Sequence, residues 1–328
     1  MKLLVLGGTR FVGRFMVEAA LERGHRVTLF NRGKTDPEGV PGAEHLTGDR
    51  TEGLDALAGR TWDAVIDSSG YAAKHVRASA GALAGAVGRY VFVSTISVYS
   101  DFARPGMDED GPVFDPDFES LDRAGDRYGP MKVACERVVE GVYGDRALVV
   151  RPGIVAGPDD YTDRLPYWVR RIAAGGEVLA PGRPHAPVQL IDARDLGAWL
   201  VRMTEEGASG TYNAVGPEAP YTLREVLDTV RRVTGSDAAF TWVSDDFLLE
   251  QGLTPWGELP FWQPAEEEGV FRVDNRRAVA AGLAFRPLAD TVRDVAAARA
   301  THHPGERVSG IPREREAELL RAWHDRTP

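Results

Sequence analysis

Apolar runs alternate with helical patterns along the first 155 residues of the chain, and this alternation constrains the fold more than any other feature. The runs that we predict as strands lie at 2–6, 26–31, 43–47, 64–67, 90–94 and 147–151. Helical patterns lie between them, near 12–23, 51–58, 72–87 and 129–142. Strands that alternate with helices pair in parallel, with the connecting helices on both faces of the sheet. The sequence therefore predicts an α/β fold around a doubly wound parallel sheet of the Rossmann type.

The pattern changes after about residue 155, where short helices and proline-rich turns replace the regular alternation. A strand–helix unit at 188–204 and a strand at 210–216 are predicted to return to the main sheet. Helical patterns resume at 275–282, 287–300 and 313–325, after a stretch at 236–270 without a clear period. We expect residues 1–155, with returning segments at about 188–216, to form one domain, and residues 156–328 to form mostly a smaller, interleaved lobe.

Composition places the chain among globular proteins. Apolar residues make up 43% of it, which suffices for a core, and the absence of a run of about 18 apolar residues predicts no membrane span. Because the first strand follows Met1 directly, we expect no signal peptide and a cytoplasmic protein, which the single cysteine, Cys135, also favours. The net charge of −10 disfavours a nucleic-acid partner, since phosphate binding needs a basic face. The seven histidines show no metal-ligand spacing, so we predict no metal.

A glycine turn follows the first predicted strand and opens the first predicted helix. It reads GGTRFVG at 7–13 and comprises Gly7, Gly8, Thr9, Arg10, Phe11, Val12 and Gly13. Backbone N–H groups at such a helix start point at an anion, and the helix dipole favours the negative charge. The glycines permit the tight turn, the close approach of a pyrophosphate and the close packing of helix on strand. We therefore predict that residues 1–155 bind a dinucleotide cofactor.

Arg10 stands where the usual glycine fingerprint has a glycine. One hypothesis is that Arg10 lies near Arg32 and adds a positive donor for the cofactor's phosphates, and the alternative is that it points to solvent. At the end of the second predicted strand, LFNRGKT at 29–35 has no acid to accept from a ribose 2′-OH, but it carries Asn31, Arg32 and Lys34. The two cations favour NADP(H), with NAD(H) as the alternative, unless they are ordinary solvated loop charges.

Two further stretches carry groups suited to proton and hydride chemistry. YVFVSTISVYS at 90–100 is a predicted strand that ends in hydroxyl residues. RYGPMKVACE at 127–136 places Tyr128 and Lys132 four residues apart on one face of a predicted helix. An ammonium group beside a phenol lowers the pKa of the phenol, so that tyrosinate forms near neutral pH. A tyrosine and a second hydroxyl can together bind a substrate oxygen while the tyrosine transfers its proton.

In these stretches the chain resembles the short-chain dehydrogenase/reductase superfamily, in its extended or atypical branch of NAD-dependent epimerase/dehydratase proteins. The resemblance covers nearly the whole chain. It rests on the ordered motifs GGTRFVG (7–13), GDR (48–50), IDSSGY (66–71), VSTISVYS (93–100), YGPMK (128–132), RPGIVAGP (151–158) and QLIDARDLGAWL (189–200). The set indicates the superfamily and does not indicate one reaction.

The resemblance implies a role for each matched residue. Tyr128 would be the catalytic acid and base, and Lys132 would assist it and bind the nicotinamide ribose. Thr95, three residues before Val98, would be the catalytic hydroxyl in preference to Ser94. Residues implied at the cofactor are Asp49 (at the adenine edge), Arg50, Ser68, Ser69, Gly70, Pro152, Ile154 and Val155, the last three at the nicotinamide end. Relatives commonly form dimers through two long helices, which implies a homodimer through 72–87 and 129–142.

Three departures from the family pattern bear on the substrate. Ile96 and Ser97 stand where sugar dehydratases have an acid pair, so elimination of water is not expected by that route. Val188 stands where proteins that act on nucleoside-diphosphate sugars carry an arginine, and three glutamates at 266–268 stand near the place of a second. An acidic site that is poor in arginine would repel a diphosphate, unless these glutamates form a solvated loop.

Other side chains of the smaller lobe are compatible with more than one kind of substrate. The arginines that could substitute for the missing pair are Arg164, Arg170 and Arg183. The aromatic residues that could wall a substrate pocket, or could instead pack inside the smaller lobe, are Trp256, Phe261 and Trp262.

The sequence therefore predicts an NAD(P)-dependent oxidoreductase that prefers NADP(H) and transfers hydride at a secondary alcohol or ketone of a sugar-like or other small metabolite. A sugar epimerase with tightly retained NAD(P) would use the same residues twice and is the first alternative. An aminated or cationic sugar-like substrate, attracted by the acidic loop, is a variant of the enzyme hypothesis. A non-catalytic NADP-sensing or RNA-associated protein is the alternative of another class, because the GGTRF start also resembles relatives described as RNA-binding.

Overall fold

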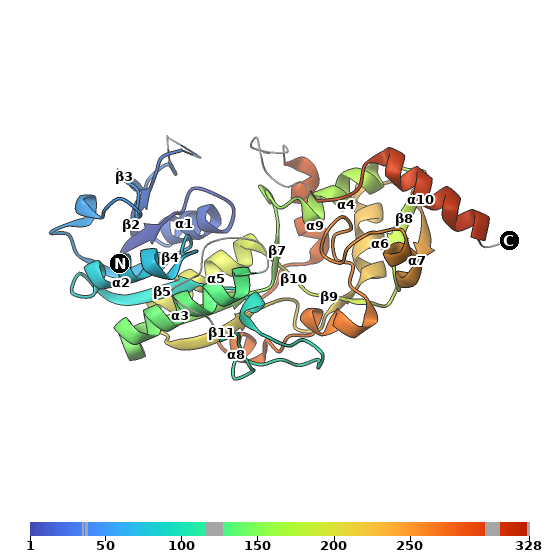
Figure 1. The fold of residues 1–328 in the computed structure, drawn as a ribbon. Helices are drawn as coiled ribbons and strands as arrows, with labels where there is room; N and C mark the ends of the chain where they lie inside the picture. Colours follow the sequence, from blue (N-terminus) through green and yellow to red (C-terminus); the bar gives the residue numbers. More distant parts are fainter. Residues whose placement is uncertain (35, 37–38, 116–126, 299–308, 327–328) are drawn as a thin grey trace.

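A sheet of seven parallel strands lies at the centre of the larger lobe (Figure 1). The computed structural model describes residues 1–34, 36, 39–115, 127–298 and 309–326. The strand order is β11-β6-β5-β4-β1-β2-β3. The strands are β1 (Lys2–Leu6), β2 (Arg26–Asn31), β3 (Glu44–Thr47), β4 (Trp62–Asp67), β5 (Val87–Val93), β6 (Ala147–Pro152) and β11 (Gly210–Ala214). This order confirms the predicted doubly wound Rossmann-type fold.

Helices cover both faces of the sheet, because alternate side chains of each buried strand point to opposite faces and both faces are apolar. Leu3 and Val5 of β1 belong to the core on one face, and Leu4 and Leu6 belong to the core on the other. The helices are α1 (Val12–Glu22) and α5 (Ala193–Glu205) on the first face, and α2 (Ala73–Leu83) and α3 (Tyr128–Tyr143) on the second.

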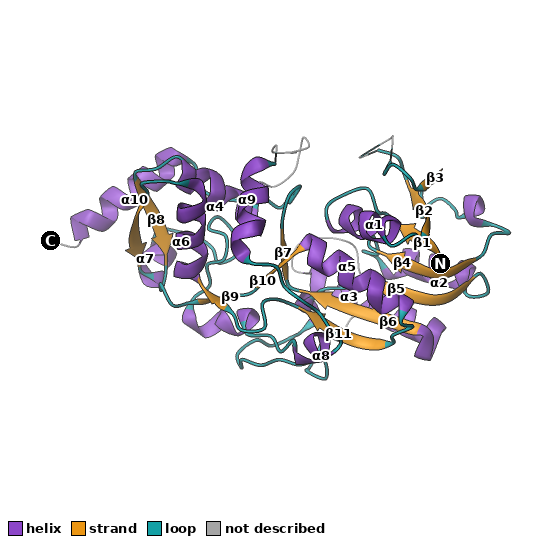
Figure 2. Ribbon diagram, turned by 180° about the vertical axis from the view of Figure 1, so that it is seen from behind, coloured by secondary structure: helices purple, strands orange, loops and turns teal. Residues whose placement is uncertain are grey.

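The smaller lobe has its own apolar core, in which Trp168, Phe247, Phe261 and Trp262 are almost fully buried. Its helices α4, α6 and α9 pack against one another (Figure 2). Its elements are α4 (Arg164–Ala173), β8 (Glu177–Pro181), α6 (Leu223–Thr234), β13 (Ala239–Val243), α7 (Asp245–Glu250), η5 (Ala265–Phe271), α9 (Leu288–Ala297) and α10 (Arg313–Arg326). The other short elements are η2 (Ile96–Val98), η4 (Gly144–Arg146), β7 (Ile154–Ala156), β9 (Pro187–Val188), β10 (Leu190–Asp192), β12 (Tyr221–Thr222) and α8 (Arg276–Ala280), the last of which packs against β11.

All six strands predicted within the first 155 residues are confirmed to within a few residues, as are the helices predicted near 12–23, 72–87 and 129–142. The helix predicted at 51–58 is wrong, since only the 3-10 helix η1 (Asp55–Leu57) forms there. Asp49 Oδ1 accepts hydrogen bonds from the backbone N–H and the hydroxyl of Thr51, at 2.9 and 2.8 Å. This local turn competes with helical hydrogen bonding.

The strand predicted to return to the main sheet near residue 188 is wrong in its pairing. β9 pairs with β12 and β10 pairs with β7, whereas β11 joins the main sheet beside β6 as predicted. Between β9 and β10 the amide of Gln189 exchanges hydrogen bonds with the backbone of Val273, each of 2.9 Å. The run therefore divides into two short strands at the lobe boundary.

The later helical predictions correspond to α8, α9 and α10, although residues 299–300 of the predicted 287–300 helix lie outside the described residues. The stretch at 236–270, in which the sequence shows no period, contains β13, α7 and part of η5. The domain boundary near residue 155 and a homodimer through α2 and α3 stay predictions.

Gly197 allows α5 to lie directly on α1. A Cβ atom at this position would lie 2.9 Å from the backbone nitrogen of Met16 and 3.1 Å from its Cα, and a backbone has little room to move aside. Because α1 begins at the end of the glycine turn, the contact also fixes where that turn lies relative to the sheet.

We expect Gly197→Ala to lower the free energy of unfolding by about 1–3 kcal/mol, because the added methyl group would force α1 and α5 apart. Gly141→Ala is the matched control: Gly141 lies in α3, and a Cβ there would have no atom within 4 Å. That substitution should raise stability by roughly 0.5–1 kcal/mol, since alanine is the better helix former. Urea unfolding followed by circular dichroism measures both changes, and equal stability of the two variants would contradict the packing argument.

Candidate active site

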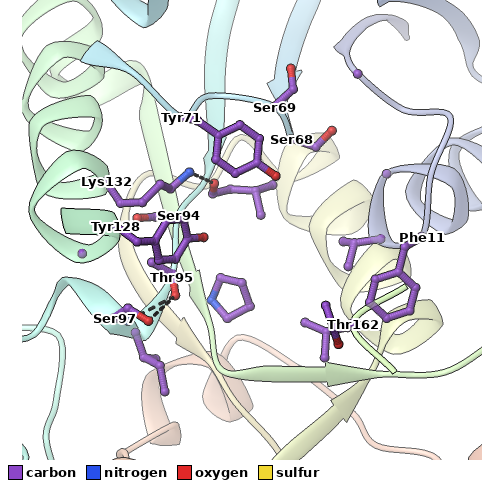
Figure 3. A pocket seen from close by; sticks show the side chains of 18 of the residues that line it. Phe11, Ser68, Ser69, Tyr71, Ser94, Thr95, Ser97, Tyr128, Lys132 and Thr162 are labelled. Carbon is purple, nitrogen blue, oxygen red and sulfur yellow. Dashed lines mark hydrogen bonds between the residues drawn. The ribbon is translucent and has the colours of Figure 1, made fainter. Parts of the chain in front are cut away.

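A cavity of about 1440 Å³ opens at the carboxyl ends of the central strands, where ligands bind in open parallel sheets. One end is formed by the glycine turn and the ends of β2 and β3, and the middle by the ends of β4, β5 and β6. The smaller lobe closes the other side through residues near 161–164, 256 and 266–270. Figure 3 shows the hydroxyls of Ser94, Thr95, Ser97 and Tyr128 on one side of this space, and Phe11 and Thr162 on the other.

The glycine turn has the backbone conformation that its sequence predicts. Gly7 and Gly8 have φ of +101° and +86°, a region that other residues rarely adopt. A Cβ on Gly8 would lie 2.8 Å from Leu29, and one on Gly13 would lie 3.0 Å from the Cα of Gly8. No side chain caps α1. The N–H groups of Gly13 and Arg14 donate to the Arg10 carbonyl, so those of Phe11 and Val12 at the start of the helix are the ones suited to an anion.

The side-chain amide of Asn31, at the end of β2, forms hydrogen bonds within the protein. Its Nδ2 donates to the Gly7 carbonyl at 3.0 Å, and its Oδ1 accepts from the Gly33 N–H at 2.8 Å and bonds His45 Nε2 at 2.9 Å. Asn31 lines the cavity, but these contacts make it a residue that holds the glycine turn in place.

Arg32 and Lys34 lie exposed at the same end of the cavity, and neither forms an ion pair with a residue that the structure describes. Asp49, which also lines the cavity, carries hydrogen bonds from the backbone and side chain of Thr51. These bonds, together with the charges of Arg32 and Lys34, lower the pKa of Asp49. This end of the cavity therefore presents two cations and one carboxylate to a ligand.

Arg50 lines the cavity, but its guanidinium group is held by the fold. Its two terminal nitrogens donate to the two oxygens of the fully buried Asp67 at 2.9 Å each, and the Tyr90 hydroxyl donates to the same carboxylate at 2.8 Å. Burial alone would raise the pKa of Asp67, but the charge and hydrogen bonds of Arg50 keep it below its usual value. Arg50 thus braces the ends of β3 and β4, and the sequence clue to this pair is the buried Asp67 that ends an apolar strand.

Thr95 follows β5 and is held by its own turn. Its Oγ1 accepts from the N–H of Ser97 at 3.1 Å and donates to the hydroxyl of Ser97 at 3.2 Å. Ser94, the neighbouring alternative, has a buried hydroxyl with no hydrogen-bond partner among the described residues. Both residues line the cavity, so the structure offers two hydroxyls where the resemblance implies one.

Tyr128 and Lys132 are one helical turn apart, and both line the cavity. Tyr128 is the first residue of α3 and is 38% exposed, whereas Lys132 is 3% exposed. Lys132 Nζ donates to the carbonyls of Gly70, at 2.8 Å, and Val93, at 2.7 Å, and lies 4.1 Å from the centre of the Phe92 ring. Burial lowers the pKa of Lys132 to about 8. The ammonium group is thus fixed between the ends of β4 and β5 and is close to releasing its proton near neutral pH.

The smaller lobe forms one wall of the cavity from polar, charged and apolar side chains. The residues of this lobe that line the cavity include Tyr161, Thr162, Arg164, Trp256, Glu266, Glu267 and Val270. Arg164 donates to the hydroxyl of Thr162 at 3.1 Å and forms no ion pair with a described residue. The single arginine therefore faces the cavity together with two glutamates.

The structure decides between the alternatives for the substrate side. Phe261 and Trp262 are about 1% exposed and pack inside the smaller lobe, whereas Trp256, alone among the three predicted aromatic residues, lines the cavity. Arg170 pairs with Asp163, and Arg183 pairs with Glu268 and Asp245, so neither replaces a missing arginine. Val188 is fully buried in the same core.

The predicted cofactor and catalytic residues come together in this one cavity. All of them line it except Gly70, whose carbonyl instead accepts from Lys132. Three features were not foreseen: the pairing of Arg50 with Asp67, the anchoring of Asn31, and the part of the wall formed by Tyr161 and Thr162. Among the described residues no cluster of three or more metal-ligating side chains occurs, and none of the helices is both long and apolar enough to cross a membrane.

Comparison with known proteins agrees with this geometry. The model of the NAD dependent epimerase/dehydratase family matches residues 3–215. The chain is 29% identical over 227 residues to the chloroplast stem-loop binding protein of 41 kDa b from Arabidopsis thaliana, which covers 63% of this chain but only 56% of that relative. It is 29% identical over 261 residues to the 2-alkyl-3-oxoalkanoate reductase of Stenotrophomonas maltophilia, covering 72% and 76% of the two chains. The fold resembles the Bordetella bronchiseptica enzyme WbmH in complex with NAD+, with a TM-score of 0.66 and 18% identity over 90% of this chain and 97% of that one.

The buried ammonium of Lys132 makes stability depend on pH in a window set by its pKa. Since this pKa falls from the usual 10.5 to about 8, the unfolded chain binds more protons than the folded chain between pH 8 and 10.5. The contribution of Lys132 to the free energy of unfolding therefore rises with pH across this window, by on the order of 3 kcal/mol. We expect Lys132→Met to lose this rise, while Lys74→Met, at an exposed lysine of α2, keeps it. Urea unfolding at pH 7.5 to 10.5 measures the slopes, and equal slopes in wild type and Lys132→Met would contradict the assignment.

Proposed function

Because the chain belongs to the NAD dependent epimerase/dehydratase family, we propose that it is a nicotinamide-dependent oxidoreductase acting at a secondary alcohol or ketone. The observation that carries the proposal is that Thr95, Tyr128 and Lys132 line the same cavity as the glycine turn. The glycine turn would hold the phosphates of a dinucleotide, and Pro152, Ile154 and Val155, which line the same cavity, would hold its nicotinamide end near the three groups.

A bound nicotinamide would supply the hydride chemistry of the proposed mechanism, to a carbonyl carbon in reduction and from a carbinol carbon in oxidation. Tyr128 donates its phenolic proton to the oxygen that becomes the hydroxyl, and takes it back in oxidation. The Thr95 hydroxyl, which donates to Ser97 when no substrate is bound, would turn to donate a hydrogen bond to that same oxygen. The ammonium of Lys132 favours the tyrosinate form by its charge, because a fixed cation in a site of low dielectric stabilises a nearby anion.

Net reduction and epimerisation use the same three groups, and the name of one relative favours reduction. That relative, at 29% identity, is a 2-alkyl-3-oxoalkanoate reductase, whose name describes a 3-keto carboxylate with alkyl substituents. The cavity of this chain is lined by partly exposed apolar side chains that could contact such substituents, among them Phe102, Phe114, Trp256 and Val270. An epimerase would instead retain its cofactor through turnover and need none added, so a dependence on added NADPH distinguishes the two.

The wall of the smaller lobe argues against a nucleoside-diphosphate sugar as substrate. A diphosphate carries charge that arginine pairs neutralise, and this wall has Arg164 opposed by Glu266 and Glu267. We propose a smaller substrate without a diphosphate. An association with RNA, suggested by the name of the chloroplast relative, is less well supported, because the net charge of −10 opposes phosphate binding.

We expect Tyr128→Phe to lower kcat for ketone reduction by 100-fold or more, since the proton donor is lost, and Thr95→Val to lower it by about 10- to 100-fold. Oxidation of NADPH at 340 nm with ethyl acetoacetate and longer 3-oxoesters as probes measures the rates. The Kd for NADPH should change less than threefold in both variants, which separates lost chemistry from lost binding. Unchanged turnover in Tyr128→Phe would reject the mechanism.

The cations beside the end of β2 are proposed to select NADP(H). A 2′-phosphate near Arg32 and Lys34 would receive charge-assisted hydrogen bonds, whereas NAD(H) has no phosphate there. We expect Arg32→Ala to weaken NADPH binding by about 10-fold and NADH binding by less than twofold. Lys74→Ala, an exposed lysine that does not line the cavity, should change neither affinity. Equal losses for both cofactors in Arg32→Ala would remove this residue from cofactor selection.

A further inference from the structure

The glycine turn touches the smaller lobe through one aromatic side chain, Tyr161. The guanidinium carbon of Arg10 lies 3.8 Å from the centre of the Tyr161 ring. The ring of Phe11 meets the same tyrosine edge to face, with centroids 6.1 Å apart and planes at 86°. Two successive residues of the turn thus pack on one side chain that lies 150 residues away in the sequence.

The loop that carries Tyr161 is held in a defined conformation. Asp159 and Asp163 have φ of +61° and +59°, a left-handed conformation that aspartate adopts more often than most residues other than glycine. Asp160 Oδ1 accepts from the backbone N–H of Thr162, at 2.9 Å, and from its hydroxyl, at 2.5 Å. Asp163 is fully buried and pairs with Arg170 of α4. Tyr161 is therefore presented to the turn by a rigid segment.

Stacking on an aromatic ring suits a guanidinium group that also has to bind phosphate. The ring engages the flat face of the group, while the N–H donors lie at its edge and point in its plane. The stack directs Arg10 toward the smaller lobe, whereas Arg32 and Lys34 lie at the ends of β2 and β3 beside Asp49. This separation favours the pyrophosphate, which both nicotinamide cofactors share, as the group that Arg10 contacts.

The same loop reaches the substrate side of the cavity. Thr162, next to Tyr161, accepts a hydrogen bond from Arg164 at 3.1 Å, and both residues line the cavity. The loop therefore borders both the glycine turn and the part of the cavity that the smaller lobe lines.

We propose that Tyr161 is a positioning residue for the cofactor: its ring holds the Arg10 guanidinium at the mouth of the glycine turn and links that turn to the substrate lobe. The proposal rests on the proposed function, because it requires that a nicotinamide dinucleotide binds at the turn. Tyr161 acts through Arg10 and supplies no proton or hydrogen bond of its own to the reaction.

The test is the Kd of the full-length protein for NADPH and for NADH, measured from the fluorescence of each cofactor. We expect Tyr161→Ala to weaken both by the same factor, about 3- to 30-fold, as the loss of a partly buried cation–π contact implies. Tyr161→Phe keeps the ring and should bind within twofold of wild type. Arg10→Ala should weaken binding at least as much as Tyr161→Ala. The double variant should bind no more weakly than Arg10→Ala alone, because the proposal assigns the effect of Tyr161 on the cofactor to the guanidinium group and none of it to the Phe11 contact.

Tyr221→Ala is the matched control, because Tyr221 is a half-buried tyrosine of the smaller lobe that does not line the cavity. It should bind both cofactors as wild type does. Any of four results would overturn the inference. These are unchanged affinity in Tyr161→Ala, a loss in Tyr161→Phe equal to that in Tyr161→Ala, a similar loss in Tyr221→Ala, and an additive loss in the double variant. If the wild type binds neither cofactor, the proposed function is rejected as well. If the wild type binds a cofactor and one of the four results is found, only the role of Tyr161 is rejected.

Discussion

The buried ammonium group of Lys132 is the interaction on which the geometry of the site depends. It bonds the carbonyl of Gly70, three residues past the end of β4, and that of Val93, the last residue of β5. A buried charge without such partners would be costly, so these two carbonyls both satisfy Lys132 and fix its position. Because Tyr128 lies one turn earlier on the same helix, its place beside the end of β5 follows from the anchoring of Lys132.

A second set of buried polar groups holds the same helix further along. Glu136, one turn after Lys132, accepts two hydrogen bonds from Arg151 of β6, at 2.8 and 3.1 Å. Arg151 also donates to the hydroxyl of Tyr99, at 3.1 Å, and that hydroxyl donates to Asn213 of β11, at 2.8 Å. The network therefore joins α3 to two strands and to the segment after Thr95. Sliding the helix would leave several buried groups without partners, which explains how a partly exposed tyrosine can keep a defined position.

Local sequence patterns predicted the features whose conformation depends on residues close together in the chain. The alternation of apolar residues located the strands, and the glycine turn has the φ values and close contacts that its glycines allow. The hydrogen-bond partners of Asn31 and Arg50 could not be predicted from local patterns. These partners, Gly7 and Asp67, lie 24 and 17 residues away and are brought close only by the parallel pairing of the strands. The contact of Arg10 with Tyr161 crosses between the lobes and has no local signal at all.

The role of a charged side chain in this site depends on whether it already forms an ion pair with another residue of the protein. Arg50 lies in the cavity wall, yet its charge is matched by the buried Asp67, so it supports the strands. Arg32 and Arg164 form no ion pair with a described residue, and they line the cavity from different lobes. Arg32 is proposed to face the adenosine part of the cofactor and Arg164 the substrate. On this proposal cofactor preference and substrate choice would rest on separate residues, so one arrangement of threonine, tyrosine and lysine could serve different substrates when only the smaller lobe changes.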